Sequence, residues 1–85
     1  MKQMINEEEL AHMREVIGAN VLSYRRENGW TQEELAEKLM YAGLSDISLN
    51  TISCIENGRT LPLLPTLYYL SVAFGCSFDD LTNGI

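Results

Sequence analysis

Apolar residues in the first part of the chain recur at the spacing that places them on one face of an α-helix. They are three or four residues apart and comprise Leu10, Met13, Ile17 and Val21. Asn6 followed by Glu9 is typical of a capping box, and Gly29 is typical of a helix end. The pattern therefore predicts a helix over about residues 7–28. Gly18 weakens its interior by about 1 kcal/mol relative to alanine, which allows a kink or a break there.

Two shorter amphipathic helices follow, and a tight connector joins them. Thr31 with Glu34 forms a second capping box before a predicted helix over residues 32–42. Its buried face is expected to consist of Leu35, Ala36, Leu39 and Met40. Ser48 can cap a third helix that ends before Gly58. The outward face of this helix contains Asn50, Ser53, Cys54 and Asn57. Such a pair of helices is typical of a helix-turn-helix.

The last part of the chain predicts two more helices. Pro65 suits the first turn of a fourth helix, and Gly75 ends it. The core stripe of this helix consists of Leu67, Leu70 and Phe74. Ser77 with Asp80 begins a short fifth helix. Because no segment alternates as a half-buried strand does, the expected fold class is all-α, with five helices.

The length and the apolar content indicate one small domain away from any membrane. The chain has 85 residues, of which 46% are hydrophobic, enough to fill one core. No window reaches the ~18 consecutive apolar residues of a membrane span. The acidic start, MKQMINEEEL, does not resemble a secretory signal, so a cytoplasmic location is expected.

The residues that carry chemistry are few and scattered. Cys54, Cys76 and the lone His12 match no metal-ligand spacing, so we expect two reduced thiols, with a metal site or a disulfide as the alternative. The sequence shows no nucleophile with a base, no coupled carboxylates in a pocket, no phosphate loop and no cofactor motif. We therefore expect no enzymatic activity, no cofactor and no small-molecule ligand.

The charge balance is acidic. Twelve acidic residues outnumber six basic ones, for a net charge of −6. DNA-binding domains usually carry a basic footprint, because neutralising phosphates releases counterions and supplies most of the non-specific affinity. Composition alone therefore does not indicate a nucleic-acid partner, and that interpretation depends on the sequence pattern.

Three segments resemble, in the same order, the lambda-repressor-like, Xre-type helix-turn-helix family. They are IGANVLSYRRENGWTQEELAEKL (17–39), NTISCIENGRTLP (50–62) and TLYYLSVAFGCSFDDL (66–81). The resemblance implies a DNA-binding domain over residues 17–85, with the helix-turn-helix pair at about 31–58, and a helical extension over residues 1–16. The turn segment MYAGLSDIS is longer than the family's commonest form. The additional residues should lengthen the second helix or widen the turn.

The resemblance implies that the third helix enters the major groove, where each base pair displays a distinct pattern of donors and acceptors. The implied base-contacting residues are Leu49, Asn50, Ser53 and Cys54. The amide of Asn50 can pair with N6 and N7 of adenine, and Leu49 can contact a thymine methyl group. Cys54 departs from the family, whose members often have a long polar or basic side chain there. An ordinary exposed helix face is the alternative interpretation.

Contacts to the DNA backbone are implied for Thr31, Gln32, Asn57 and Arg59. Gln32 begins the second helix, where its side chain can touch a phosphate and brace the recognition helix. The backbone amides at the start of this helix also form an anion site. The alternatives are a plain first-turn residue for Gln32 and a solvated loop arginine for Arg59. Arg25 and Glu56 match a pair that resembles an internal ion pair in the family, joining the first helix to the end of the third.

The fourth helix is apolar nearly all round, because Tyr68, Tyr69 and Val72 lie off its core stripe. Such a helix requires a second surface against which to bury these side chains. Since the last helices often form a two-fold interface in this family, the resemblance implies a homodimer through the C-terminal helices. The alternative is that residues 1–16 fold back over this surface.

The predicted function is sequence-specific binding of double-stranded DNA by a transcriptional regulator of bacterial or phage type. The alternative is a protein-interaction module, such as an antitoxin or an adaptor, that keeps the fold without reading DNA. The acidic composition favours this alternative, and a negatively charged recognition face would support it.

Overall fold

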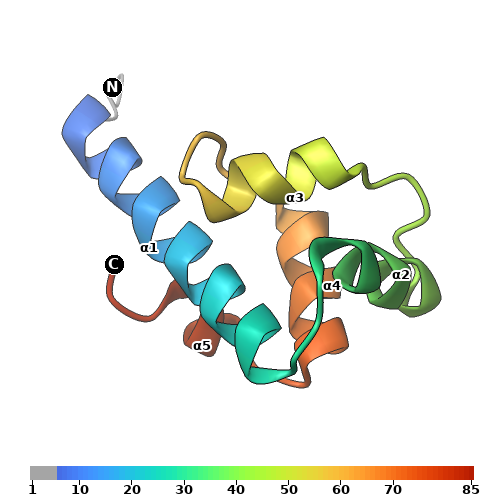
Figure 1. The fold of residues 1–85 in the computed structure, drawn as a ribbon. Helices are drawn as coiled ribbons and strands as arrows, with labels where there is room; N and C mark the ends of the chain where they lie inside the picture. The colour runs from blue at the N-terminus through green and yellow to red at the C-terminus, as the bar shows by residue number, and fades with distance from the viewer. Residues whose placement is uncertain (1–5) are drawn as a thin grey trace.

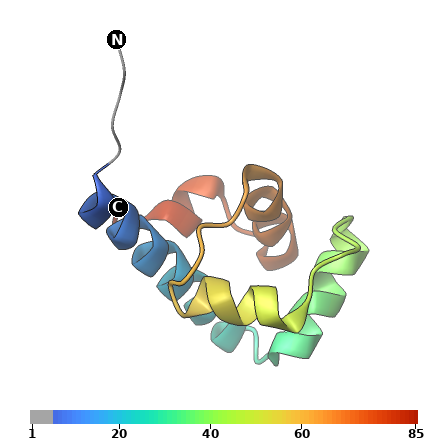
Figure 2. The ribbon, with the colours of Figure 1, turned by 90° about the horizontal axis from the view of Figure 1, so that it is seen from above.

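A computed structural model describes residues 6–85, which form five helices and no strand (Figures 1 and 2). The helices are α1 (Glu7–Glu27), α2 (Gln32–Ala42), α3 (Leu49–Glu56), α4 (Leu64–Phe74) and α5 (Phe78–Thr82). The predicted all-α, five-helix fold is therefore confirmed. Residues 1–5, the start of the predicted N-terminal extension, lie outside the described residues.

Helix α1 differs from its prediction at two points. Asn6 caps the helix, but its side chain accepts a hydrogen bond from the backbone amide of Glu8, and no reciprocal capping box with Glu9 forms. The predicted weakness at Gly18 produces no break, because the helix is continuous from Glu7 to Glu27. The division of the chain after Val16 stays a prediction, and that boundary falls inside α1.

The side-chain caps of α2, α3 and α5 are those expected from the sequence. Reciprocal capping boxes form between Thr31 and Glu34 and between Ser77 and Asp80. The hydroxyl of Ser48 accepts from the amide of Thr51 and so fixes the start of α3. These caps satisfy backbone amides that have no partner within the helix, and each contributes about 1 kcal/mol.

All five helices contribute apolar side chains to one core. Its buried members are Ile17, Val21, Leu35, Leu39, Ile52, Ile55, Leu67, Leu70 and Leu81. The expectation that Met40 is buried is wrong, because its residue surface is 50% exposed. Met40 lies about 100° further round α2 than Leu39, which takes the inward position. Phe74 is half-buried and stacks on Tyr24 and Trp30 at the edge of the core.

The long segment between α2 and α3 widens the turn and leaves α2 at its predicted length. Helix α2 ends at Ala42, and Gly43 follows with φ of +126°, a conformation that L side chains rarely adopt. Leu44 and Ile47 anchor the turn by packing against the core. Helix α3 then packs between α1 and α2, and Figure 2 shows it at the opposite side of the molecule from α4 and α5.

Among the described residues, no helix combines the length and the apolar content that crossing a membrane requires.

Candidate nucleic-acid interface

Helix α3 has one buried face and one exposed face. Ile52 and Ile55 are buried against the rest of the bundle. The first turn is open to solvent at Leu49, Asn50 and Thr51, and the next turn is half-buried at Ser53 and Cys54. The structure therefore places the four predicted base-contacting residues on one short helix, with the most accessible of them at its N-terminal end.

The amide side chains proposed for DNA contact differ in how they are used. Gln32 donates from Nε2 to Oε1 of Glu56 at 3.0 Å, and Asn57 donates from Nδ2 to the backbone oxygen of Ser53 at 2.9 Å. The side chain of Asn50 has no hydrogen-bond partner within residues 6–85 and is exposed. Asn50 therefore offers a complete set of amide donors and acceptors to a ligand.

A buried ionic network holds α3 against α1 and the start of α2. The Nε and Nη2 atoms of Arg25 donate to the two carboxylate oxygens of Glu56 at 2.6 and 3.0 Å. The side chains of Arg25 and Glu56 are only 14% and 4% exposed. Arg25 also donates from Nη1 to the backbone oxygen of Trp30 at 2.8 Å. The hydrogen bonds to Glu56 raise the pKa of Arg25 above its ordinary value, so the guanidinium stays charged.

This network changes the interpretation of Gln32. The predicted phosphate contact would use the side-chain amide, but its nitrogen is already bonded to Glu56 on α3. Gln32 thus holds the start of α2 directly to α3. Its backbone amide, in the first turn of α2, and the second hydrogen on Nε2 stay available as donors.

Gly18 is a positioning residue that sequence reasoning missed. It is buried on α1, and a Cβ atom there would lie 2.3 Å from the backbone oxygen of Ile55 and 3.1 Å from that of Glu56. Only glycine allows the backbones of α1 and α3 to approach this closely. The signal was a lone glycine one position after a core residue, Ile17, within an otherwise strong helical pattern.

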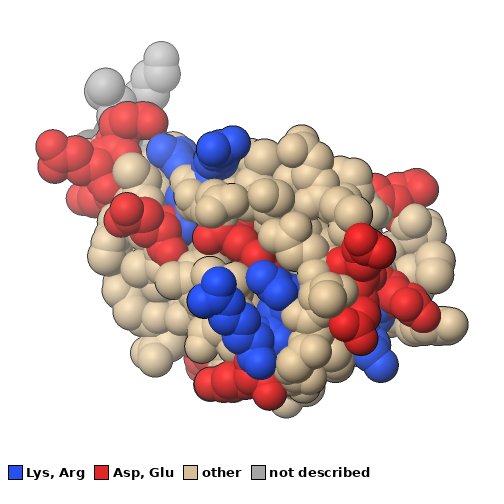
Figure 3. Space-filling view, viewed as in Figure 1, with Lys and Arg blue, Asp and Glu red and all other residues tan. Residues whose placement is uncertain are grey.

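The charge around α3 is mixed. Figure 3 shows basic atoms near the N-terminal half of α1 and the loop after α3, at the end of α1 beside α2, and in a smaller group on the side of α2. Acidic atoms lie between these groups and on both sides of them. The only carboxylate on α3 itself belongs to Glu56, which is buried and paired with Arg25. The exposed face of α3 is therefore free of negative charge.

The predicted backbone-contacting residues flank α3 at two places. Arg59 is exposed just after α3, and its backbone amide is held by the carbonyl oxygen of Cys54 at 2.9 Å. Thr31 caps α2, and its hydroxyl accepts from the amide of Glu34 at 3.1 Å. Lys38 lies over the ring of Trp30, with Nζ 5.3 Å from the ring centroid. Arg25 is paired with Glu56 and is therefore not available to a phosphate. Arg59 is exposed and lies three residues after the end of α3.

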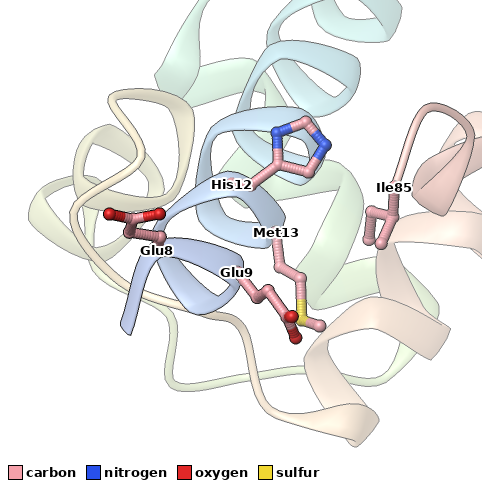
Figure 4. Close-up of a pocket in the computed structure, with 5 residues that line it drawn as sticks. All are labelled: Glu8, Glu9, His12, Met13 and Ile85. Atoms are coloured by element: carbon pink, nitrogen blue, oxygen red, sulfur yellow. The ribbon is translucent and has the colours of Figure 1, made fainter. Parts of the chain in front are cut away.

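The other chemistry-bearing side chains of the described residues are two thiols and one imidazole. Cys54 and Cys76 are free thiols, and partial burial raises the pKa of Cys76. A hollow of about 340 Å³ lies at the N-terminal end of α1, lined by Glu8, Glu9, His12, Met13 and Ile85 (Figure 4). The Nε2 atom of His12 lies 3.2 Å from the backbone oxygen of Gly84, which ties the C-terminal tail to α1.

Comparison with known proteins identifies the family. The helix-turn-helix family profile matches residues 21–81. The chain is 39% identical over 71 residues to the HTH-type transcriptional regulator y4dJ of Sinorhizobium fredii, covering 84% of each chain.

It is also 37% identical over 65 residues to the competence pilus inhibition repressor of Acinetobacter baylyi, covering 76% of this chain but 54% of the repressor. The crystal structure of the hypothetical transcription factor NHTF from Neisseria has a similar fold, with a TM-score of 0.72 over 96% of this chain and 85% of that one, at 23% identity. The chain therefore belongs to the lambda-repressor-like helix-turn-helix family of DNA-binding transcriptional regulators.

Proposed function

We propose that the protein binds double-stranded DNA sequence-specifically, with α3 in the major groove and its first turn against the base edges. The observation that carries this proposal is the exposed face of α3, which has an unbonded amide at Asn50 and no accessible carboxylate. Leu49, Asn50, Ser53 and Cys54 would contact bases from this face. A transcriptional regulator of this kind would work in the cytoplasm of a bacterial cell, at the nucleoid.

Selection of bound duplexes from a random pool tests the proposal. The full chain should enrich one short motif, and Asn50→Ala should reduce the preference at a single base pair by about 1–3 kcal/mol. The exposed Ser23 on α1 provides a control, since Ser23→Ala should leave the motif unchanged. A folded protein that enriches no motif would contradict the proposal and favour the protein-interaction alternative.

Backbone contacts would come from Arg59, Asn57, Thr31 and the amide of Gln32. Arg59 supplies the charge, and Thr31 and Gln32 supply neutral donors at the start of α2. Asn57 would donate to a phosphate only by giving up its hydrogen bonds to Ser53. Because few cations are available in a chain of net charge −6, affinity should fall only gently as salt rises.

Replacing Arg59 with alanine should weaken binding to all duplexes by a similar factor. One phosphate contact fewer means that about one counterion fewer is released, so the slope of log affinity against log salt should decrease in magnitude by about 1. Fluorescence anisotropy at several salt concentrations measures the slope. Lys38→Ala serves as the control, because Lys38 is held over Trp30 and should leave the slope unchanged. A loss of preference at one base pair in Arg59→Ala would instead mean that Arg59 reads a base.

We propose that α4 forms a two-fold homodimer interface. Apolar side chains on α4 and the residue before it are open to solvent, with exposed fractions of 75% at Leu63, 68% at Leu64, 55% at Tyr68 and 48% at Val72. No residue from Thr60 to Phe78 is charged. The described part of the N-terminal extension leaves these side chains uncovered. A dimer would present two copies of α3 about 34 Å apart, matching one turn of DNA.

Introducing a charge at Tyr68 should dissociate this dimer. Tyr68→Glu would bury an unpaired carboxylate in an apolar interface. The cost of desolvating this charge would exceed the free energy gained on dimerisation. Sedimentation equilibrium should change from twice the 9.6 kDa chain mass to the chain mass itself. Leu49→Glu, at the exposed start of α3, should leave the dimer intact. A wild-type chain that sediments as a monomer at tens of micromolar would contradict the proposed interface.

A further inference from the structure

We infer that α3 reads A·T base pairs, with Asn50 on an adenine and with Leu49 and Thr51 on thymine methyl groups. The target would then be a half-site centred on A·T pairs, without a guanine read by a bidentate side chain. This inference rests on the proposed function of sequence-specific DNA binding and specifies its substrate.

The recognition helix lacks the side chains that read G·C pairs most strongly. Residues 48–57 contain neither lysine nor arginine, the residues that pair bidentately with O6 and N7 of guanine. Arg59 is ten residues beyond Leu49, which corresponds to about 15 Å along a helix, and it follows the end of α3 opposite the first turn. Glu56, the one carboxylate among residues 48–57 and so the strongest acceptor for cytosine N4, is buried and paired with Arg25.

Asn50 supplies the polar part of the recognition. Its side chain is exposed in the first turn of α3 and has no partner within residues 6–85. One amide oxygen and one NH₂ group match the N6 donor and N7 acceptor of adenine, so a bidentate pair can form without breaking an internal hydrogen bond.

The neighbours of Asn50 supply apolar contacts. Leu49 is 44% exposed, so a large part of its surface is open to a ligand. Thr51 is also exposed, but its hydroxyl oxygen lies 2.9 Å from the hydroxyl oxygen of Ser48. The Ser48 oxygen also accepts a hydrogen bond from the backbone amide of Thr51. Because one position of the hydroxyl is engaged by Ser48, the methyl group is the apolar group that this exposed residue can offer to DNA. The first turn of α3 thus presents two apolar groups beside one free amide, the set that matches adenine and the C5-methyl of thymine.

Deoxyuridine substitution tests the inference, because uracil differs from thymine only in lacking that methyl group. The full chain is first used to select duplexes, and each thymine of the selected half-site is then replaced singly by deoxyuridine. At the thymines contacted by Leu49 and Thr51, we expect affinity to fall about fourfold, the effect of one buried methyl group. Asn50→Ala should reduce the preference for one adjacent adenine about 5- to 150-fold.

Two variants assign the methyl contacts to their residues. Thr51→Ser keeps the hydroxyl that bonds to Ser48 and removes only the methyl group, so one thymine should become insensitive to replacement by deoxyuridine. Leu49→Ala should abolish the sensitivity at another thymine. A role in folding alone would weaken all duplexes equally and would leave the ratio of thymine to deoxyuridine affinity unchanged.

The outcomes separate this inference from the proposed function. A selected half-site centred on G·C pairs, or one that tolerates deoxyuridine everywhere, would overturn the inference while sequence-specific binding stands. Equal binding to all duplexes, or none by a folded chain, would overturn the proposed function and the inference together.

Discussion

Replacing Glu56 with alanine should destabilise the domain more than any other single change at the interface. The variant leaves the guanidinium of Arg25, which is 14% exposed, without its carboxylate partner. It also removes the acceptor that Gln32 uses to hold α2 against α3. Removing one member of a buried ion pair typically costs 3–5 kcal/mol, a large part of the about 5–15 kcal/mol that stabilises a small domain. For 85 residues this corresponds to a fall in Tm of roughly 12–40 °C.

Thermal unfolding followed by circular dichroism measures this effect, and two controls separate its causes. Arg26→Ala removes an exposed arginine adjacent in sequence, and it should change stability by less than about 0.5 kcal/mol. The double variant Arg25→Met with Glu56→Leu removes both charges and should recover much of the lost stability, because no unpaired charge remains. If Glu56→Ala were as stable as Arg26→Ala, the network would not be what fixes α3.

The helix boundaries could be predicted because they depend on interactions within a few residues. The capping residues Thr31, Ser48 and Ser77 each bond to an amide three residues further on. A sequence therefore contains both members of each capping interaction, and helices α2, α3 and α5 begin where these residues predicted. Gly43 and Gly75 end helices for the same local reason, since both adopt positive φ.

The features that sequence reasoning missed depend on which hydrogen bonds the polar side chains form in the folded chain. The sequence gives no indication that the amide of Gln32 is bonded to Glu56, because α2 and α3 must first be packed together. The amide of Asn57 is bonded to Ser53 in its own helix, an interaction that competes with a DNA contact. Thr51 is absent from the base contacts predicted from the sequence, and we propose it only because the residue is exposed and its hydroxyl lies against Ser48.

Net charge was the least informative property of the sequence. A value of −6 weighs against DNA, but it does not say where the carboxylates lie. On α3 the single carboxylate is neutralised inside the bundle. Three glutamates lie in the first turn of α1, at the opposite end of that helix from Arg25, which pairs with Glu56. The distribution of charge over the surface therefore bears on DNA binding more directly than the total does.

Replacing Gly18 with alanine should destabilise the domain even though alanine is the better helix former. In the middle of α1 the change in intrinsic propensity favours alanine by about 1 kcal/mol. The added Cβ, however, would lie 2.3 Å from the backbone oxygen of Ile55, and a backbone carbonyl cannot move aside as a flexible side chain can. Helices α1 and α3 must therefore separate, and overpacking of this kind costs typically 1–3 kcal/mol or more.

The sign of the change in stability distinguishes packing from propensity at Gly18. Ser23 lies on the exposed side of α1, so Ser23→Ala raises the helix propensity without creating a clash with another helix. This variant should stabilise the domain slightly. Chemical denaturation should place Gly18→Ala below the wild type and Ser23→Ala at or above it. Because the separation displaces the recognition helix, Gly18→Ala should also weaken DNA binding at temperatures where the variant is fully folded. A Gly18→Ala protein more stable than the wild type, with unchanged affinity, would show that α1 does not set the position of α3.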